Sequence, residues 1–355
     1  MKSAVRGMAG IACAGSLVLL AAGCGGRSTE DSTGGGSGKG DDKKHSAAVG
    51  VVSQAQADKL VDHYEKINNK ANKNSDPKLL STVEGGAVFQ QSKATFKVQK
   101  TWSAKDRAEY RNPFRYVDRK FYIPRKGTAD WFVMVAHSKS PGEKKGKYPG
   151  ILIMEKQKSG DWKMVTASYS ETKKLPRLAK DKGGFAVPVT NTAKKTGAQS
   201  PDSLSDSLLD LYTGQGASGS GFRPSKTTKW IRKIPKAQNK LLSPYGAAEF
   251  SRGEPTHEKA YALRTANGGS LAVFSTQVRE HDRGTQVTAT IHPSDKMKVY
   301  VGDTSGAPAF FVDWLHISSA YIRPQGRPDL LGSEYEMTGA AAATDADGNM
   351  PGADS

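Results

Sequence analysis

The sequence predicts an α+β protein with two tandem domains, each of helices followed by a curved antiparallel sheet, behind a disordered tether. Three observations predict this class. The chain has 355 residues, and soluble domains average about 150. Apolar residues recur at helical spacing where each half begins, and strand-like segments bounded by turn residues follow. A basic, irregular stretch separates the halves. We therefore expect domains over residues 51–175 and 201–331, joined by a linker over residues 176–200.

The first 23 residues have the features of a signal peptide. Lys2 and Arg6 form a positive start, and an apolar run of about 15 residues follows between Met8 and Ala22. Secretory signals have apolar runs of this length, whereas a membrane-spanning helix needs roughly 20 residues. We expect export and removal of residues 1–23. The alternative is an ordinary secretory signal followed by a chance cysteine.

The end of this segment, LLAAGC at residues 19–24, resembles the lipobox of bacterial, actinobacterial-type lipoproteins, although Ala21 stands where the pattern prefers Leu. The resemblance implies cleavage between Gly23 and Cys24 and transfer of a diacylglyceryl group to Cys24. A cysteine suits this transfer because its thiol is nucleophilic. Two acyl chains anchor a protein stably. We therefore expect lipid attachment at Cys24 and a location on the extracytoplasmic face of the cell membrane.

Residues 24–50 are rich in Gly, Ser, Asp and Lys and contain no aromatic residue. A segment of this composition cannot bury enough apolar surface to become ordered. As a flexible coil it would span roughly 28 Å on average. We interpret it as the tether between the lipid and the folded part.

Helices and then strands are predicted for the first half. Ser53 and Gln56 form a capping-box pattern, and apolar residues recur at helical spacing over residues 60–71. Asp76 followed by Pro77 predicts the start of a short second helix. Strands are expected over residues 87–102, 114–123, 131–137, 148–158 and 162–169.

This order of elements, closed by a Gly-Asp-Trp-Lys-Met-Val strand at residues 160–165, resembles the cone-shaped nuclear transport factor 2-like fold of ketosteroid isomerase and SnoaL-like proteins. The resemblance implies a cavity between the concave face of the sheet and the first helix. Its candidate lining residues are His63, Tyr64, Tyr116 and Asp118. Neither the carboxylate base nor the oxyanion donor of isomerase chemistry can be assigned to a particular residue. No catalytic residue is predicted, and ordinary helix-surface and strand positions are the simpler interpretation.

The second half repeats the pattern loosely. A helix is expected over residues 202–212, and a basic, helix-like stretch follows that breaks at Pro235. Strands are expected over residues 260–265, 271–280, 286–291, 298–301 and 310–322. Residues 332–355 are rich in Ala, Gly and Asp, which predicts a disordered acidic tail.

The charge of the chain favours anionic partners. The formal net charge is +17 at pH 7, and loss of Lys2 and Arg6 with the signal lowers it by two, to +15. Phospholipid head groups and cell-wall polymers would attract such a surface, although solubility alone is an alternative explanation. The export signal argues against nucleic acid as a partner.

The sequence contains no nucleophile elbow, complete phosphate loop or metal-binding spacing, and we expect no metal and no cofactor. The sequence thus predicts a lipid-anchored, non-enzymatic module for binding or assembly. Its partners would be the membrane, through the lipid, and either anionic envelope polymers or another envelope protein. An enzyme or a small-ligand binder that uses the cone cavity is the alternative.

Overall fold

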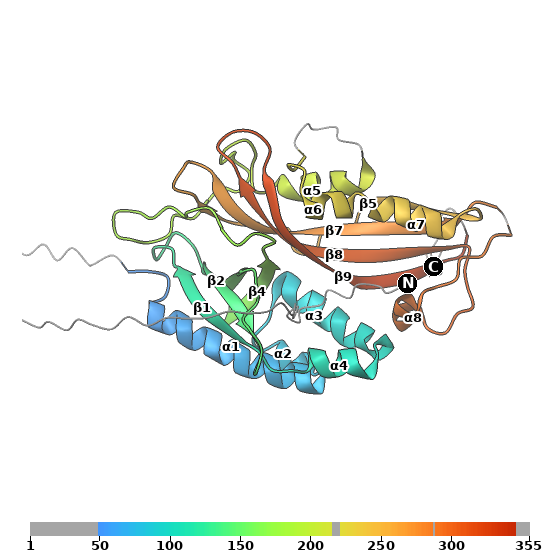
Figure 1. The fold of residues 1–355 in the computed structure, drawn as a ribbon, viewed down its shortest axis with the longest axis horizontal. Coiled ribbons are helices and arrows are strands. Elements are labelled where there is room, and N and C mark those ends of the chain that lie inside the picture. Colours follow the sequence, from blue (N-terminus) through green and yellow to red (C-terminus); the bar gives the residue numbers. More distant parts are fainter. Residues whose placement is uncertain (1–48, 215–220, 287, 346–355) are drawn as a thin grey trace, which may run out of the picture.

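The computed structural model describes residues 49–214, 221–286 and 288–345 (Figure 1). The expected signal peptide, Cys24, nearly all of the tether and residues 346–355 of the expected tail lie outside the described residues. Within the described residues, no helix is long and apolar enough to cross a membrane.

The first half begins with helices and continues into an antiparallel sheet. The helices are α1 (Gln54–Asn74), α2 (Pro77–Leu80), α3 (Gly86–Val98), the 3-10 turn η1 (Gln99–Thr101) and α4 (Ala104–Tyr110). The strands β1 (Arg115–Tyr122), β2 (Trp131–Lys139), β3 (Gly150–Lys156) and β4 (Trp162–Tyr169) pair in chain order. The strands expected over residues 114–123, 131–137, 148–158 and 162–169 are therefore confirmed.

The second half contains a longer antiparallel sheet with the order β5-β7-β8-β9, and β6 also pairs with β7. Its strands are β5 (Gly246–Arg252), β6 (Tyr261–Arg264), β7 (Ser270–Gly284), β8 (Ala309–Ile322) and β9 (Asp329–Ala343). Its helices are α5 (Leu204–Thr213), α6 (Lys226–Ile231), α7 (Ile234–Leu242) and α8 (Asp295–Val301). In Figure 1, α5, α6 and α7 cover one side of this sheet, while α1 and α4 lie on the opposite side of the molecule.

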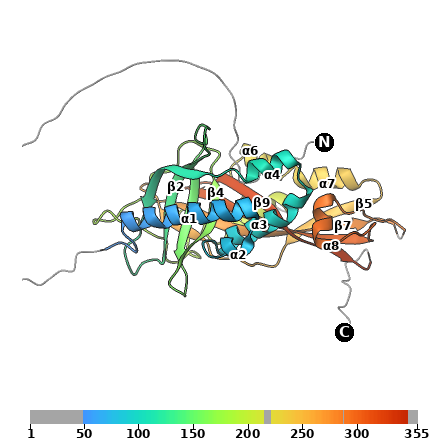
Figure 2. The same cartoon turned by 90° about the horizontal axis from the view of Figure 1, so that it is seen from below.

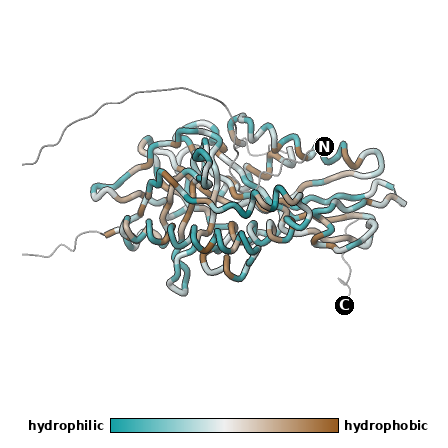
Figure 3. The backbone as a smooth tube through the Cα atoms, turned by 60° about the horizontal axis from the view of Figure 1, so that its bottom comes forward, coloured by the Kyte–Doolittle hydropathy of each residue, from teal (hydrophilic) through white to brown (hydrophobic). Residues whose placement is uncertain are grey.

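Local sequence accounts for the helix starts in the first half. Ser53 accepts a hydrogen bond from the backbone N–H of Gln56, and the Gln56 side chain accepts one from the backbone N–H of Ser53, completing the capping box of α1. Asp76 caps α2 and Pro77 occupies its first position. In Figure 3, α1 alternates between hydrophilic and hydrophobic along its length, as a helix buried on one side must.

The prediction of a strand over residues 87–102 is wrong, because residues 87–101 form α3 and η1. The segment is rich in β-branched and aromatic residues, which suggests a strand. The buried positions, however, include Val88, Gln91, Thr95 and Val98, which recur at helical spacing. This face packs on β4, β8 and β9, and tertiary packing overrides weak local preference. The strand expected over residues 298–301 is likewise part of α8.

The prediction of a disordered tail that begins at residue 332 is wrong for residues 332–343. Residues 329–343 form β9, which pairs with β8 from Tyr321↔Asp329 to Ala309↔Ala343. Alanine and glycine look like low complexity in the sequence, but their small side chains let β9 pack closely. A long neighbouring strand supplies the hydrogen bonds that this segment cannot make alone.

The segment expected as a linker, residues 176–200, is held by both halves in the structure. Isolated bridges join Ala186 to Pro124 of the first half, and Leu178 and Pro188 to Thr265 and Leu263 of the second. One hydrophobic core also draws on both halves. Its buried members include Phe132, Leu152, Met164, Val273, Ile317 and Leu331. The α+β class with antiparallel sheets is confirmed, and the two sheets pack together as one folded unit (Figure 2).

Candidate functional site

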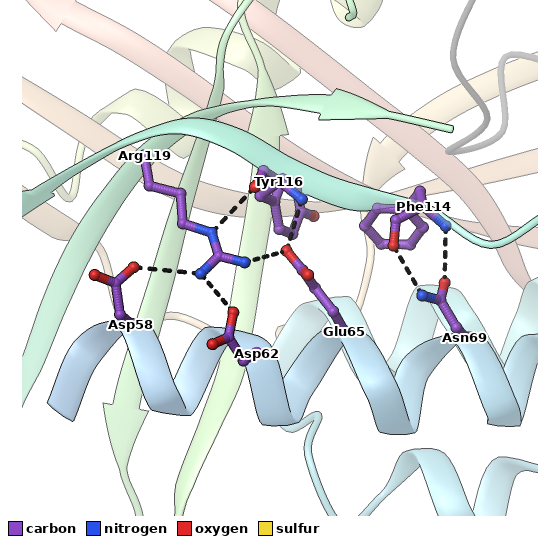
Figure 4. Close-up of polar contacts among 7 residues, drawn as sticks. All are labelled: Asp58, Asp62, Glu65, Asn69, Phe114, Tyr116 and Arg119. Atoms are coloured by element: carbon purple, nitrogen blue, oxygen red, sulfur yellow. Dashed lines mark hydrogen bonds and ion pairs between the residues drawn. The ribbon is translucent and has the colours of Figure 1, made fainter. Parts of the chain in front are cut away.

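An arginine on β1 is clasped by three carboxylates of α1 (Figure 4). The Nη1 atom of Arg119 lies 2.7 Å from Asp62 Oδ1 and 3.3 Å from Asp58 Oδ1, and its Nη2 atom lies 2.7 Å from Glu65 Oε1. The three acids recur every turn of α1, so they face β1 together. Glu65 Oε1 also accepts a hydrogen bond of 2.6 Å from the backbone N–H of Tyr116. The clasp fixes α1 across the sheet.

A bulge in β1 makes this arrangement possible. The pairing of β1 with β2 shifts between Val117 and Lys120, and Asp118 within the bulge has a φ of 56°. Aspartate tolerates this left-handed conformation better than most residues. Bulges redirect side chains, and here Tyr116 is buried while Arg119 reaches α1 (Figure 4).

Beneath the clasp, side chains of α1 meet a buried carboxyl group. Tyr64 donates a hydrogen bond to Glu84 Oε1 at 2.9 Å, and Asn68 donates to the same oxygen at 3.0 Å. Burial raises the pKa of Glu84 to about 7, opposed by hydrogen bonds from Ser92, Tyr64 and Asn68. A buried carboxyl group of this kind is held partly protonated near neutral pH.

The network continues toward the second sheet. The rings of Tyr64 and Tyr116 stack with centroids 6.5 Å apart, and the hydroxyls of Tyr116 and Tyr169 lie 3.0 Å apart. Glu334 of β9 accepts the backbone N–H of Tyr169 at 2.9 Å, and burial raises the pKa of Glu334 to about 8. Burial also raises the pKa of Tyr169 to about 12. We call these residues the tyrosine–glutamate cluster: Tyr64, Asn68, Glu84, Tyr116, Tyr169 and Glu334.

Two of the four residues predicted from the sequence lie in this cluster, and two do not. Tyr64 and Tyr116 belong to it. His63 is exposed on α1, and Asp118 is exposed on β1, where it pairs with Lys145. The sequence interpretation missed Glu84 and Glu334, because a lone glutamate beside a glycine pair and another in an apparent tail carry no recognisable pattern.

The cluster has the groups of an acid–base site but is closed to substrate. A carboxyl group with a pKa near neutrality suits proton transfer, and tyrosine hydroxyls can stabilise an oxyanion. The exposed fractions are only 3% for Tyr64, 1% for Glu84 and 4% for Tyr116. The cluster is therefore part of the packed core in this conformation.

A second set of buried polar groups lies under α5 and α7. The Nε2 atom of His316, on β8, lies 2.8 Å from the hydroxyl of Tyr212. Its Nδ1 atom lies 2.9 Å from Ser333 Oγ. Burial lowers the pKa of His316 to about 3, which keeps the ring neutral. Burial and the neighbouring Asp282 raise the pKa of Glu280. No group of three or more His, Cys, Asp or Glu residues suited to a metal ion occurs in the described part of the chain.

An accessible site lies among the loops at one end of the molecule. A pocket of about 450 Å³ is lined by Pro176, Arg177, Ala266, Asn267, Tyr321 and Arg323. We call it the loop-end pocket. Its lining residues come from the segment after β4, the turn between β6 and β7, and the end of β8. Ala266 donates its backbone N–H to Arg177 O at 2.8 Å, and Asn267 donates to the Tyr321 hydroxyl at 2.6 Å.

Two guanidinium groups give this pocket its chemistry. Arg323 lies over the ring of Tyr321 at 5.4 Å and pairs with Asp329 at 2.6 Å. Its Nε atom is buried and has no hydrogen-bond partner among the described residues. Arg177 is exposed and forms no ion pair with a described residue. Guanidinium groups suit carboxylate and phosphate, so the pocket can accept an anionic group.

The loops around the pocket add further positive charge. Exposed cations follow one another in residues 172–200 and in the turn between β8 and β9, and the loop 192–200 contacts that turn through a hydrogen bond from Ala198 N to Arg323 O. Besides Arg177, these cations are Lys173, Lys174, Lys180, Lys182, Lys194, Lys195 and Arg327. The basic character of the stretch between the halves is visible in the sequence, but only the topology brings it beside the turn between β8 and β9.

Comparison with known proteins shows relatives along most of the chain. A family model described as a domain of unknown function, DUF8094, matches residues 48–342. An uncharacterized lipoprotein of Streptomyces coelicolor is 30% identical over 261 residues, which cover 71% of this chain and 72% of the relative. An uncharacterized lipoprotein of Streptomyces avermitilis is 26% identical over 259 residues, covering 71% and 74%. No solved structure matches the chain. The family match spans both sheets and nearly all of β9.

Proposed function

Since the chain belongs to the DUF8094 family, with lipoproteins of Streptomyces among its relatives, we propose that it is a lipid-anchored extracytoplasmic envelope protein. Within the envelope it acts as a non-enzymatic module that binds anionic polymers. The observation that carries the binding role is the loop-end pocket, where Arg177 and Arg323 lie among further exposed cations.

The anchoring part of this proposal is supported by the lipobox-like residues 19–24 and by the names of the relatives. Cys24 is the expected site of lipid attachment. A Cys24→Ala variant should lose incorporation of radiolabelled palmitate, because no other thiol remains after the signal is removed. The matched control is Cys13→Ala, which removes a thiol inside the signal and should leave labelling unchanged. Palmitate labelling that persists in Cys24→Ala would exclude this attachment site.

The binding part follows from charge and accessibility. The pocket is open to solvent, whereas the tyrosine–glutamate cluster is enclosed. Arginine forms paired hydrogen bonds to phosphate and carboxylate groups, and the phosphate- and carboxylate-rich polymers of a bacterial envelope repeat such groups along their length. Several weak contacts on one polymer add up to a much higher overall affinity.

A sedimentation assay with purified cell-wall material tests the binding role. The chain from Gly25 onward keeps every described residue and lacks the lipid. We expect it to pellet with wall material at low salt and to be released near 1 M salt, where the Debye length falls to about 3 Å. Arg177→Gln should weaken binding about 10-fold, by loss of a charge-assisted contact. The control Lys70→Gln removes an equal charge from the exposed face of α1 and should bind as the wild type does. Equal affinity of both variants would exclude the pocket as the site.

A small-ligand or enzymatic role in a cone-like first half is the alternative. Tyr64, Tyr116 and Glu84 favour it chemically, because they bring hydroxyl groups and a carboxyl group of raised pKa together. Their enclosure favours the binding module, since a substrate would have to open the core. The resemblance to the nuclear transport factor 2-like cone is retained as a hypothesis for the first half, where helices precede an antiparallel sheet.

A further inference from the structure

The outward faces of α6 and α7 carry a concentration of positive charge. Residues 226–248 contain no Asp or Glu. All the lysine and arginine side chains in this stretch are exposed, and none forms an ion pair with a described residue. These cations are Lys226, Lys229, Arg232, Lys233, Lys236 and Lys240.

The same segment exposes large apolar side chains. Trp230 is 40% exposed, Leu241 is 74% exposed and Tyr245 is 62% exposed. Among the described residues, Val49 is the only other large hydrophobic residue in this exposed class. Single exposed apolar side chains need no explanation. Three of them within the 16 residues 230–245 of a cationic segment indicate an interaction surface.

Helical spacing places these side chains together. Lys229, Trp230 and Lys233 share one side of α6 and the turn after it, and Lys236, Lys240 and Leu241 share the outer side of α7. The opposite side of each helix is occupied by the protein. Ile231 is buried, Gln238 donates to Asp282, and Asn239 bonds to the backbone of Ala248. We call the outward side the basic–apolar face.

This face lies on the outside of the molecule. In Figure 1, α5, α6 and α7 form the outermost layer over the second sheet, on the side away from α1 and α4. Trp230 is held in place by the ring of Tyr335, with centroids 5.2 Å apart. The indole is therefore presented to solvent in a defined orientation.

We propose that the basic–apolar face docks on the surface of an anionic phospholipid membrane. Helices that lie in a membrane interface combine Lys and Arg with Trp, Phe or Leu on the side that faces the lipid. Tryptophan and tyrosine favour the level of the head groups, and lysine and arginine are attracted by anionic lipids. Trp230, Leu241 and Tyr245 would enter the interface while the surrounding cations contact head groups.

The proposal rests on the lipid anchoring proposed above, and the spacing permits it. Twenty-four residues lie between Cys24 and Val49, and a fully extended chain of this length would reach about 85 Å from Cys24 to Val49. A membrane is also the occupant that explains both properties of the face. A hydrophilic polymer would use the cations but would gain little from exposed Trp230, Leu241 and Tyr245.

Vesicle co-sedimentation tests the proposal with the unlipidated chain from Gly25 onward. The vesicles contain either phosphatidylcholine alone or phosphatidylcholine with phosphatidylglycerol at 3:1. We expect binding to the anionic vesicles only. The charge variant Lys233→Gln/Lys236→Gln/Lys240→Gln should bind on the order of 100-fold more weakly, at roughly fivefold per cation. The apolar variant Leu241→Gln/Tyr245→Ser should bind about 10-fold more weakly by loss of apolar burial.

The matched control is Lys66→Gln/Lys70→Gln/Lys73→Gln on the exposed side of α1, which removes the same charge from the opposite side of the molecule. It should bind as the wild type does. Quenching of tryptophan fluorescence by brominated lipid should fall in Trp230→Phe, because the indole of Trp230 is the exposed one in the face.

Each outcome decides the question. Failure of the wild type to bind anionic vesicles, or equal binding by the α7 and α1 variants, would overturn the membrane proposal. Running every variant with wall material as well separates the two proposals. Loss of wall binding in the α7 charge variant, with vesicle binding intact, would assign the face to polymers instead. Wall binding that depends on Arg177 while no variant binds vesicles would leave the proposed function standing alone.

Discussion

Glu84 and Glu334 are carboxylic acids placed in the interior of the protein, and their titration is linked to folding. Burial raises their pKa values from 4.5 to about 7 and about 8. Between the ordinary pKa of 4.5 and the raised pKa of each group, the native state therefore binds more protons than the unfolded state. The stabilisation is complete below pH 4.5 and is lost as the pH rises through about 7 for Glu84 and about 8 for Glu334.

A Glu84→Gln variant tests this linkage. The amide oxygen can still accept the hydrogen bonds of Tyr64 and Asn68, but the group no longer ionises. We expect the fall in unfolding free energy between pH 5 and pH 8 to shrink by roughly 1–3 kcal/mol, since each linked proton contributes up to about 1.4 kcal/mol per pH unit. Urea unfolding at several pH values measures this change in the unfolding free energy for the variant and the wild type.

The control for this experiment is Glu109→Gln on the exposed surface of α4, which should leave the pH dependence unchanged. If Glu84→Gln and the wild type lose stability in parallel as the pH rises, Glu84 does not titrate between the native and unfolded states. The raised pKa would then be refuted for this group.

At the scale of elements, β9 is the strand that joins the two sheets. Glu171 donates its backbone N–H to Leu331 O at 2.6 Å, just beyond the end of β4. Ser168 of β4 donates to Ser319 Oγ of β8 at 2.9 Å. Gly332 lies at this crossing, where a Cβ atom would come within 2.0 Å of the backbone oxygen of Tyr169. The absence of a side chain at residue 332 lets the two backbones meet.

Two glycines of β9 provide a matched test. Gly332→Ala should lower the unfolding free energy by roughly 3 kcal/mol, because the backbone of β4 cannot move aside without disturbing the packing of the core. Gly339→Ala should cost less than about 1 kcal/mol, since its nearest neighbour is the Asp313 side chain at 3.3 Å. Urea unfolding at pH 7 measures both variants. Equal stability of the two variants would show that β9 does not press against β4 at Gly332.

At the scale of the whole molecule, the two sheets share one hydrophobic core, with members from Val52 to Leu331. Gln91 of α3 donates to the backbone oxygen of Leu315 at 2.8 Å, a contact between residues 224 positions apart. Neither half can bury its apolar surface without the other. The halves should therefore unfold together.

Limited trypsin digestion under native conditions tests this unity. The exposed lysines of residues 172–200 are accessible to cleavage, but the fragments should remain associated through the shared core. We expect the nicked protein to elute as a single species in size-exclusion chromatography, and the intact chain to unfold in one urea transition. Fragments that separate without denaturant, or two resolved transitions, would show that the halves fold independently.

The functional surfaces also belong to this scale. The loop-end pocket and the basic–apolar face lie on different parts of the molecule, one among loops and the other on the outer helices. If the proposed lipid is attached at Cys24, the protein would contact a membrane through one surface and an envelope polymer through the other. The crossed set of variants described above separates these contacts.

The sequence by itself determined the elements whose signals are local. The capping box of Ser53 and Gln56 begins α1, and Asp76 and Pro77 begin α2. The strands of the first sheet lie where short apolar segments between turn residues predict them. These features depend on residues within a few positions of one another, so a linear pattern contains them. The lipobox-like segment at Cys24 is equally local, and its assignment stays a prediction.

Only the tertiary structure decided the identity of α3 and β9 and the two proposed surfaces. Residues 87–98 are helical because three strands cover one side of them, and residues 329–343 are extended because β8 supplies their hydrogen bonds. Tyr64 donates a hydrogen bond to Glu84 across 20 positions, and chain topology alone places Arg177 and Arg323 in the lining of one pocket. Burial and electrostatic environment depend on distance in space, and spacing along the chain does not encode that distance.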